Sequence, residues 1–343
     1  MGAQTRRQIA SLLEVFGVYL TGAFLSNQVA ELLVRWHVVS AQSPFELLTP
    51  HSTNSELLVA SRQLLLTLII LYGSYFALII AINHWRGRRG PAAYGLTREG
   101  RSWNCLILAG LATSCLTQWP VLVHTLVDAV HPLGAMAPWR QAFFAMSWHR
   151  WQFWLFAGIL SYGLIPFIEE LIFRGYYQHR LAEDWGNGPA VIGTACFFTF
   201  AHKQYFIANA YNVTMIASLF CMAIGLGVVY AWTRSLVPSI VAHALINIPM
   251  IPVWQGVLLA AFVVGACFAW RGGIKALKVF RKSTLAACVL LAVLETAYVV
   301  GNGRIPGLTY VSVGMLLMAL VLEAVDRHNN PARPISPDVD ATS

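Results

Sequence analysis

Two adjacent carboxylates and an arginine interrupt an otherwise apolar stretch at residues 169–174, where the sequence reads Glu-Glu-Leu-Ile-Phe-Arg. On a helix, Glu170 and Arg174 are one turn apart in the favourable order for an ion pair, so we expect the arginine to neutralise Glu170. Glu169 points about 100° away and has no such partner in its own helix. A carboxylate of this kind suits a general base that takes a proton from water, although it can also serve only to hold helices together.

Two other apolar stretches carry residue pairs with the same spacing. Phe198 lies one helical turn before His202, which places both rings on one face, and His243 lies one turn before Asn247. Histidine can transfer protons, and both His243 and Asn247 can donate hydrogen bonds. Each pair also has a purely structural interpretation, either as a hydrogen-bonded histidine in the core or as a polar pair that joins two helices.

The depth of these side chains favours a shared site. At 1.5 Å per residue, Glu169 lies about 17 Å and His202 about 20 Å from the predicted inner ends of their helices. His243 lies about 10 Å from the inner end of its own helix, a difference that helix tilt or shifted boundaries can absorb. We therefore expect the polar residues of the three helices to meet at one level.

The stretches around these residues are apolar enough to cross a membrane. The 343-residue chain is 57% hydrophobic and 11% charged, and its mean hydropathy is +0.60. These values lie outside the range of ordinary soluble domains. Because an ionisable group at such depth costs about 3 kcal/mol on insertion scales, it typically marks a working site. We expect an all-α polytopic membrane protein.

The hydropathy pattern predicts ten transmembrane helices. Their approximate ranges are 9–34, 60–83, 104–127, 151–180, 189–206, 210–233, 236–253, 255–270, 284–301 and 309–325. The first run is interrupted by Glu14, Asn27 and Glu31, and an amphipathic helix that lies in the membrane interface would give a similar pattern.

The basic residues support ten spans with both termini in the cytoplasm. With the N-terminus inside, all but six of the 23 lysines and arginines lie on the cytoplasmic side, as the positive-inside rule predicts. The six exceptions are Arg35, Arg62, Arg140, Arg150, Lys203 and Arg304. In a prokaryote the expected location is the cell membrane.

The net charge of +8 does not indicate a nucleic-acid partner. The excess positive charge lies in short loops beside the predicted spans, where topology and anionic lipid headgroups account for it. The six cysteines lie within apolar runs and include no CxxC pair, a pattern typical of buried thiols.

The chemistry-bearing residues form an ordered set. Along the chain they read Glu-Glu-x-x-x-Arg, Phe-x-x-x-His and His-x-x-x-Asn, each on its own predicted span. This set resembles the CPBP family of intramembrane proteases, which includes the CAAX-processing enzyme of the Rce1 type and the bacteriocin-processing or self-immunity (Abi) proteins. The segments Phe173-Arg174-Gly175 and 242–247 are similar to that family as well. The resemblance covers about residues 95–255.

The resemblance implies a glutamate-dependent peptide hydrolase that needs no cofactor. Glu169, helped by His202, would activate a water molecule for attack on a peptide carbonyl. His243 and Asn247 would donate hydrogen bonds to the oxyanion of the tetrahedral intermediate. The supporting residues would be Glu170, Arg174 and Phe198. The implied partners are the lipid bilayer and a membrane-associated or lipidated peptide or protein substrate; the pattern assigns no oligomeric state.

This interpretation divides the chain into four segments. Residues 1–94 hold the first two helices and a basic inner loop, and residues 95–255 hold the protease core. Residues 256–325 add further C-terminal helices. The tail, 326–343, is rich in Pro, Asp and Asn, and we expect it to be a disordered cytoplasmic segment.

Two alternatives remain at this point. Two glutamates and two histidines could form a zinc site, although HExxH is absent and no carboxylate closely follows His243. The second alternative is a non-enzymatic transporter, immunity protein or scaffold subunit. In such a protein the polar residues would line an ion path or tie helices together.

Overall fold

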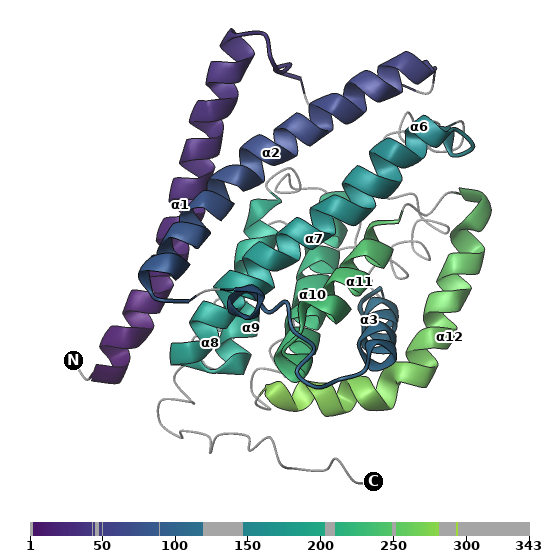
Figure 1. Ribbon diagram of the computed structural model, residues 1–343. Helices are drawn as coiled ribbons and strands as arrows, with labels where there is room; N and C mark the ends of the chain where they lie inside the picture. Colours follow the sequence, from purple (N-terminus) through teal and green to yellow (C-terminus); the bar gives the residue numbers. More distant parts are fainter. Residues whose placement is uncertain are drawn as a thin grey trace.

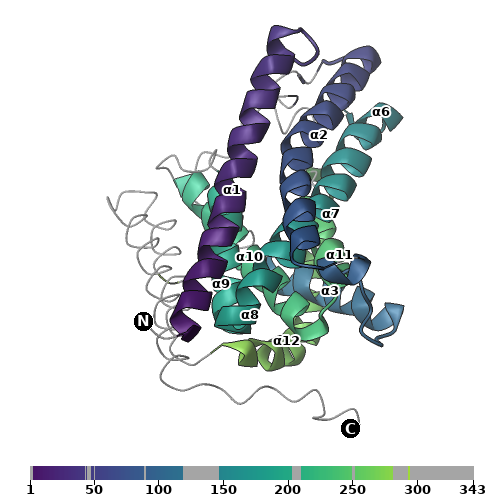
Figure 2. The same ribbon diagram turned by 60° about the vertical axis from the view of Figure 1, so that its left-hand side comes forward.

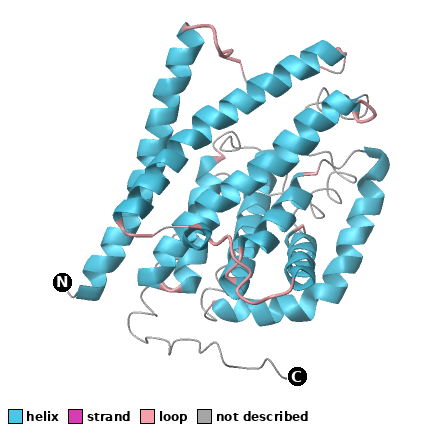
Figure 3. Ribbon diagram, in the orientation of Figure 1, coloured by secondary structure: helices cyan, strands magenta, loops and turns pink. Residues whose placement is uncertain are grey.

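The computed structural model describes residues 3–42, 44, 48–49, 51–88, 90–118, 147–202, 210–248, 252–280 and 293. In these residues all the regular elements are helices, as Figure 3 shows. The prediction of an all-α protein is confirmed for this part of the chain.

Four helices within the described ranges are long and apolar enough to cross a membrane. They are α1 (Ala3–Arg35), α2 (Asn54–Trp85), the continuous helix Trp151–Trp185, and the stretch Gly256–Val279, which combines most of α12 (Pro252–Ala276) with the short helix η5 (Leu277–Val279). The interrupted first run thus forms a helix of membrane-spanning length.

Further helices form much of the rest of the described chain. They are η1 (Pro91–Tyr94), α3 (Trp103–Thr117), α9 (Asn187–Ala201), α10 (Ala210–Thr233) and α11 (Leu236–Asn247). The helices α3, α9 and α11 are shorter than the runs that predicted them, and most of the remainder of those runs lies outside the described residues. The count of ten membrane-spanning helices is not confirmed. The ninth and tenth predicted spans, 284–301 and 309–325, lie outside the described residues except for residue 293.

The continuous helix Trp151–Trp185 changes its winding along its length. It passes through α6 (Trp151–Trp154), the π-helix η2 (Leu155–Leu164), α7 (Ile165–Glu170), the π-helix η3 (Leu171–Gln178) and α8 (His179–Trp185). The wider winding of η2 ends just before Pro166, which has no N–H and whose ring crowds the carbonyl four residues earlier. Such π segments are frequent at functional sites, and here they flank the two adjacent glutamates.

Figures 1 and 2 show how the helices are arranged. α2 lies beside the helix 151–185, and α1 packs against both α2 and α8. On the other side of the helix 151–185, α9 and α10 pack together, α11 lies between α3 and α7, and α12 borders α3. The helix that carries the two glutamates is therefore surrounded by other elements.

A stripe of small and β-branched residues holds α1 against the other helices. The buried positions recur every three or four residues, which places them on one face of the helix: Ser11, Val15, Val18, Gly22 and Ser26. At Gly22 a Cβ atom would lie 2.5 Å from the ring of Tyr75 on α2. A larger residue at this position would therefore separate the two helices.

The main core lies between η3, α9 and α10. Phe173 of η3 and Phe198 of α9 meet edge to face, with ring centroids 5.1 Å apart. Around them lie buried aliphatic and aromatic residues that include Ile172, Tyr177, Val191, Ile192 and Leu226. This packing fixes the rotation of the helix 151–185 about its axis, and with it the direction of the neighbouring glutamates.

Candidate active site

Three helices bring the predicted site residues together. α7 carries Glu169 and Glu170, α9 ends immediately before His202, and α11 carries His243. A tight turn at Gly186, where φ is +79°, reverses the chain so that α9 returns along η3. The hydroxyl of Ser235 accepts a hydrogen bond from the N–H of Val237 and caps the start of α11.

Glu170 and Arg174 form the predicted ion pair. Nη1 of Arg174 lies 2.8 Å from Oε1 of Glu170, and both side chains have no exposed surface. Nη2 of the same guanidinium donates to the carbonyl of Ala223 on α10, at 3.0 Å. The guanidinium also lies over the ring of Phe198, 5.0 Å from its centroid. Arg174 therefore neutralises a buried carboxylate and ties it to two neighbouring helices.

His243 lies between the two glutamates. Its Nδ1 is 2.8 Å from Oε1 of Glu170, and its Nε2 is 3.7 Å from Oε2 of Glu169. A carboxylate paired with an arginine is a hydrogen-bond acceptor, so Nδ1 of His243 carries the donated proton. This arrangement turns Nε2 toward Glu169. The contact also places α11 at the level of the glutamates, in agreement with the predicted shared depth.

Glu169 has a partner that the sequence pattern did not reveal. The hydroxyl of Tyr72, on α2, donates a hydrogen bond of 2.5 Å to Oε1 of Glu169. The two residues are 97 positions apart, so no local spacing connects them. Glu169 is itself largely buried. Its two oxygens face two different helices, one toward Tyr72 and the other toward His243.

His202 packs against Phe198, as their spacing predicts. The ring centroids are 4.8 Å apart, and Nδ1 of His202 lies 2.9 Å from the carbonyl oxygen of Phe198. Because a carbonyl only accepts, Nδ1 carries the proton, and Nε2 keeps its lone pair. Phe198 also meets the ring of His243 at 5.7 Å, so it lies against both histidines. Among the described residues, no hydrogen bond or ion pair joins His202 to Glu169.

Asn247 is the last residue of α11, one helical turn beyond His243. Its side chain is partly exposed and has no hydrogen bond to other residues in the described part of the chain. The structure thus brings Glu169, Glu170, Arg174, Phe198 and His243 into one set of contacts, with His202 attached through Phe198. Asn247 lies on the same helix as His243, at the edge of this set.

Within the described ranges, no group of three or more His, Cys, Asp and Glu side chains is arranged to hold a metal ion.

Comparison with known families identifies the central part of the chain. Residues 141–249 match the model of the type II CAAX prenyl endopeptidase Rce1-like family. The chain carries an Rce1-like domain. This domain contains α7, α9 and α11, and with them all seven of the predicted site residues. Comparisons with curated proteins and with solved structures found no match.

The Rce1-like domain indicates a CAAX-type intramembrane protease, and therefore a peptide hydrolase that acts on a peptide or protein in the membrane. The apolar helices described above agree with an integral membrane protein. The match is consistent with the CPBP family and falls within the range 95–255 over which the resemblance was expected. Tyr72 and the whole of α2 lie outside it.

Proposed function

We propose that this protein is a glutamate-dependent intramembrane endopeptidase. Its substrate is a membrane-associated or lipidated peptide or protein, and one peptide bond is hydrolysed with water as the nucleophile. The observation that carries the proposal is the position of His243, whose Nδ1 binds Glu170 while its Nε2 faces Glu169 at 3.7 Å. A buried carboxylate beside an oriented imidazole is an arrangement that moves protons in many hydrolases.

Glu169 is the general base of this proposal, and His202 assists it. A water molecule between them gives its proton to the carboxylate as its oxygen attacks the peptide carbonyl carbon. The protonated carboxyl group then passes this proton to the amide nitrogen as the carbon–nitrogen bond breaks, which releases the new amino terminus. His202 supports this step because its Nδ1–H is committed to the carbonyl of Phe198. Its Nε2 is therefore the basic nitrogen and can orient the water.

His243 and Asn247 stabilise the tetrahedral intermediate. With Nδ1–H donated to Glu170, His243 can carry a second proton on Nε2 and donate it in a hydrogen bond to the developing oxyanion. The amide of Asn247, one turn further along the same helix, supplies a second donor. A preorganised donor of this kind contributes about 3–4 kcal/mol to transition-state stabilisation.

Glu170 and Arg174 position these groups and do not react. The ion pair gives the Nδ1–H of His243 a charged acceptor, which fixes the tautomer and the orientation of the imidazole. The low dielectric of the surrounding helices strengthens each of these electrostatic contacts. A lipid-anchored segment can reach such a site laterally between helices, which explains why hydrolysis is performed inside a membrane.

The test is cleavage of a membrane-tethered reporter by the purified full-length chain in liposomes. Wild type should release a new peptide terminus that mass spectrometry identifies, and Glu169→Gln should release none while keeping the wild-type melting temperature. Glu99→Gln is the matched control, because Glu99 lies on an exposed loop, where its carboxylate accepts a hydrogen bond from the hydroxyl of Thr97.

Cleavage that persists in Glu169→Gln would remove this residue from the reaction. A correctly folded wild type that cuts no membrane-tethered substrate would favour the non-enzymatic alternative. In that case, Glu169→Gln should instead abolish the flux of a substrate or of protons.

A further inference from the structure

The helix α2 lies outside the Rce1-like domain, yet it supplies a direct partner of the proposed base. The hydroxyl of Tyr72 donates to Oε1 of Glu169 at 2.5 Å, while Oε2 of Glu169 faces His243. The hydrogen bond therefore sets the rotation of the carboxylate. Without it, rotation about the last side-chain bond of Glu169 would no longer be restrained from the α2 side.

A second contact joins the C-terminal end of α2 to the C-terminal end of the helix 151–185, which we call the inner end. Nη2 of Arg86, directly after α2, lies 3.3 Å from Oε2 of Glu183 on α8. The Tyr72–Glu169 and Arg86–Glu183 pairs both join residues 97 positions apart. α2 and the helix 151–185 therefore run parallel between these pairs, which lie about 21 Å apart along α2.

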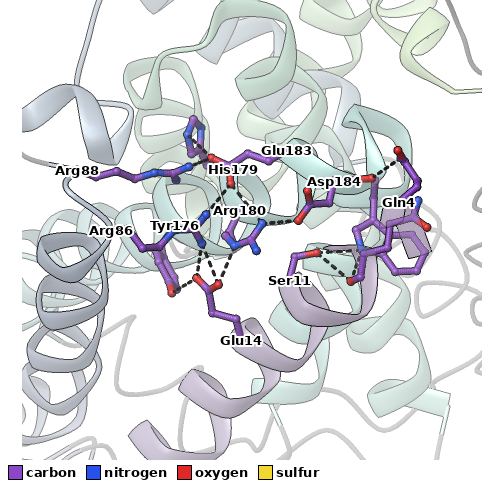
Figure 4. A network of polar contacts seen from close by, with 12 residues as sticks. Gln4, Ser11, Glu14, Arg86, Arg88, Tyr176, His179, Arg180, Glu183 and Asp184 are labelled. Carbon is purple, nitrogen blue, oxygen red and sulfur yellow. Dashed lines mark hydrogen bonds and ion pairs between the residues drawn. The ribbon is translucent and has the colours of Figure 1, made fainter. Parts of the chain in front are cut away.

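The inner contact belongs to a larger cluster of charges, which Figure 4 shows in close-up. Glu14 of α1 accepts from Nη1 of Arg86 at 2.8 Å and from Nε of Arg180 at 2.9 Å. Glu183 is paired with Arg86, Arg88 and Arg180. Nη1 of Arg180 also lies 2.7 Å from Oδ2 of Asp184, and the hydroxyl of Tyr176 donates to Glu14. We call these residues the inner network: Glu14, Arg86, Arg88, Tyr176, Arg180, Glu183 and Asp184.

The inner network fixes the position of α2 along its axis. It connects α1, the end of α2 and α8 through several partly buried ion pairs, and networked pairs of this kind hold geometry better than isolated surface pairs. A shift of one residue along α2 would move the Tyr72 hydroxyl by about 1.5 Å, enough to break its bond to Glu169. The network and Tyr72 thus hold the helix at two levels.

We propose that Tyr72 is a positioning residue for Glu169, and that the helix pair α1–α2 completes the active site of the Rce1-like domain from outside it. This inference rests on the proposed function, because it assigns Glu169 the role of base. The hydroxyl acts through the carboxylate: it donates to Oε1, and it keeps Oε2 on the side of His243, where the attacking water is bound in the proposed reaction.

The experiment compares Tyr72→Phe with Tyr75→Phe in the full-length protein. Tyr75 lies three residues further along α2, and its hydroxyl donates to the carbonyl of Tyr19 at 3.2 Å, away from the site. Loss of one hydrogen bond to a charged group should lower kcat about 10- to 100-fold in Tyr72→Phe, with KM within about twofold of wild type. Tyr75→Phe should keep the kcat and KM of wild type.

An unchanged or higher kcat in Tyr72→Phe would overturn the inference while leaving the proposed function in place. A second measurement does not depend on turnover. Infrared difference spectra should contain a carboxylate band that disappears in Glu169→Gln and shifts in Tyr72→Phe but not in Tyr75→Phe. A band that does not move in Tyr72→Phe would disprove the contact even if the wild type cleaves no substrate.

Discussion

Nε2 of His243 lies 3.7 Å from Oε2 of Glu169, so α11 places the proposed oxyanion donor beside the proposed base on α7. The other nitrogen of the ring is bound to Glu170, which is in turn paired with Arg174. The imidazole is therefore held from one side and free to act on the other. The predictions below separate the residues that act from those that hold them.

Replacement of Asn247 tests the proposed oxyanion donors. Asn247→Ala should lower kcat about 10²- to 10³-fold with KM nearly unchanged, because the lost hydrogen bond forms only in the transition state. Steady-state kinetics on the membrane-tethered reporter measure the effect. Asn104→Ala, at an exposed position on α3, is the matched control. Wild-type kinetics in Asn247→Ala would remove this residue from the site.

Replacement of His202 tests the assistance given to the base. His202→Ala should abolish measurable turnover, since its Nε2 orients the attacking water, while substrate binding persists. A pull-down of the uncleaved reporter measures binding separately from cleavage. His84→Ala changes an exposed histidine near the end of α2 and should behave as wild type. If the two histidine variants cleave equally well, His202 has no part in the reaction.

Replacement of Arg174 tests the structural role of the buried ion pair. Arg174→Met leaves Glu170 buried without its charged partner, which should lower the free energy of unfolding by about 3–5 kcal/mol. Denaturant unfolding in detergent micelles measures the loss. Arg35→Met breaks the Glu31–Arg35 pair, whose side chains are 62% and 77% exposed, and should cost less than about 1 kcal/mol. Equal losses in both variants would contradict this prediction.

Exhaustive chelation tests the zinc alternative. We expect the reporter to be cleaved at the same rate before and after dialysis against a strong chelator, because in the proposed reaction water is activated by Glu169 and His202. Heat-treated protein carried through the same dialysis provides the background rate. Activity that is lost on chelation and restored by added zinc would show that the reaction depends on the metal.

Local spacing predicted part of the site correctly. The Glu170–Arg174 pair and the Phe198–His202 contact each join residues four positions apart, where helix geometry alone decides that the side chains meet. The meeting of α7 with α11 was predicted from the approximate depth of their polar residues. The counted depth of His243 differed most from the others, although α11 begins at Leu236, where the apolar run also begins.

Other features had no signal in the sequence. The Tyr72–Glu169 bond depends on the packing of two helices whose contacting residues are 97 positions apart, and one of two tyrosines in an apolar run does not stand out. The π-helical winding of 155–164 and 171–178 was not predicted from the sequence. The number of spans was estimated from apolar runs, yet α11 has only 12 residues and much of its run continues beyond it.

The π-helix η3 lies between two groups of side chains that must point in set directions. Before η3, Glu169 faces α2 and Glu170 faces α11. After η3, Arg180 faces α1 and Glu183 faces the end of α2. An α-helix turns by about 100° per residue and the wider π-helix by somewhat less, so deleting a single residue within 175–178 would rotate one group against the other by a large angle. The helix itself would survive such a deletion, but its two ends would no longer match the same neighbours.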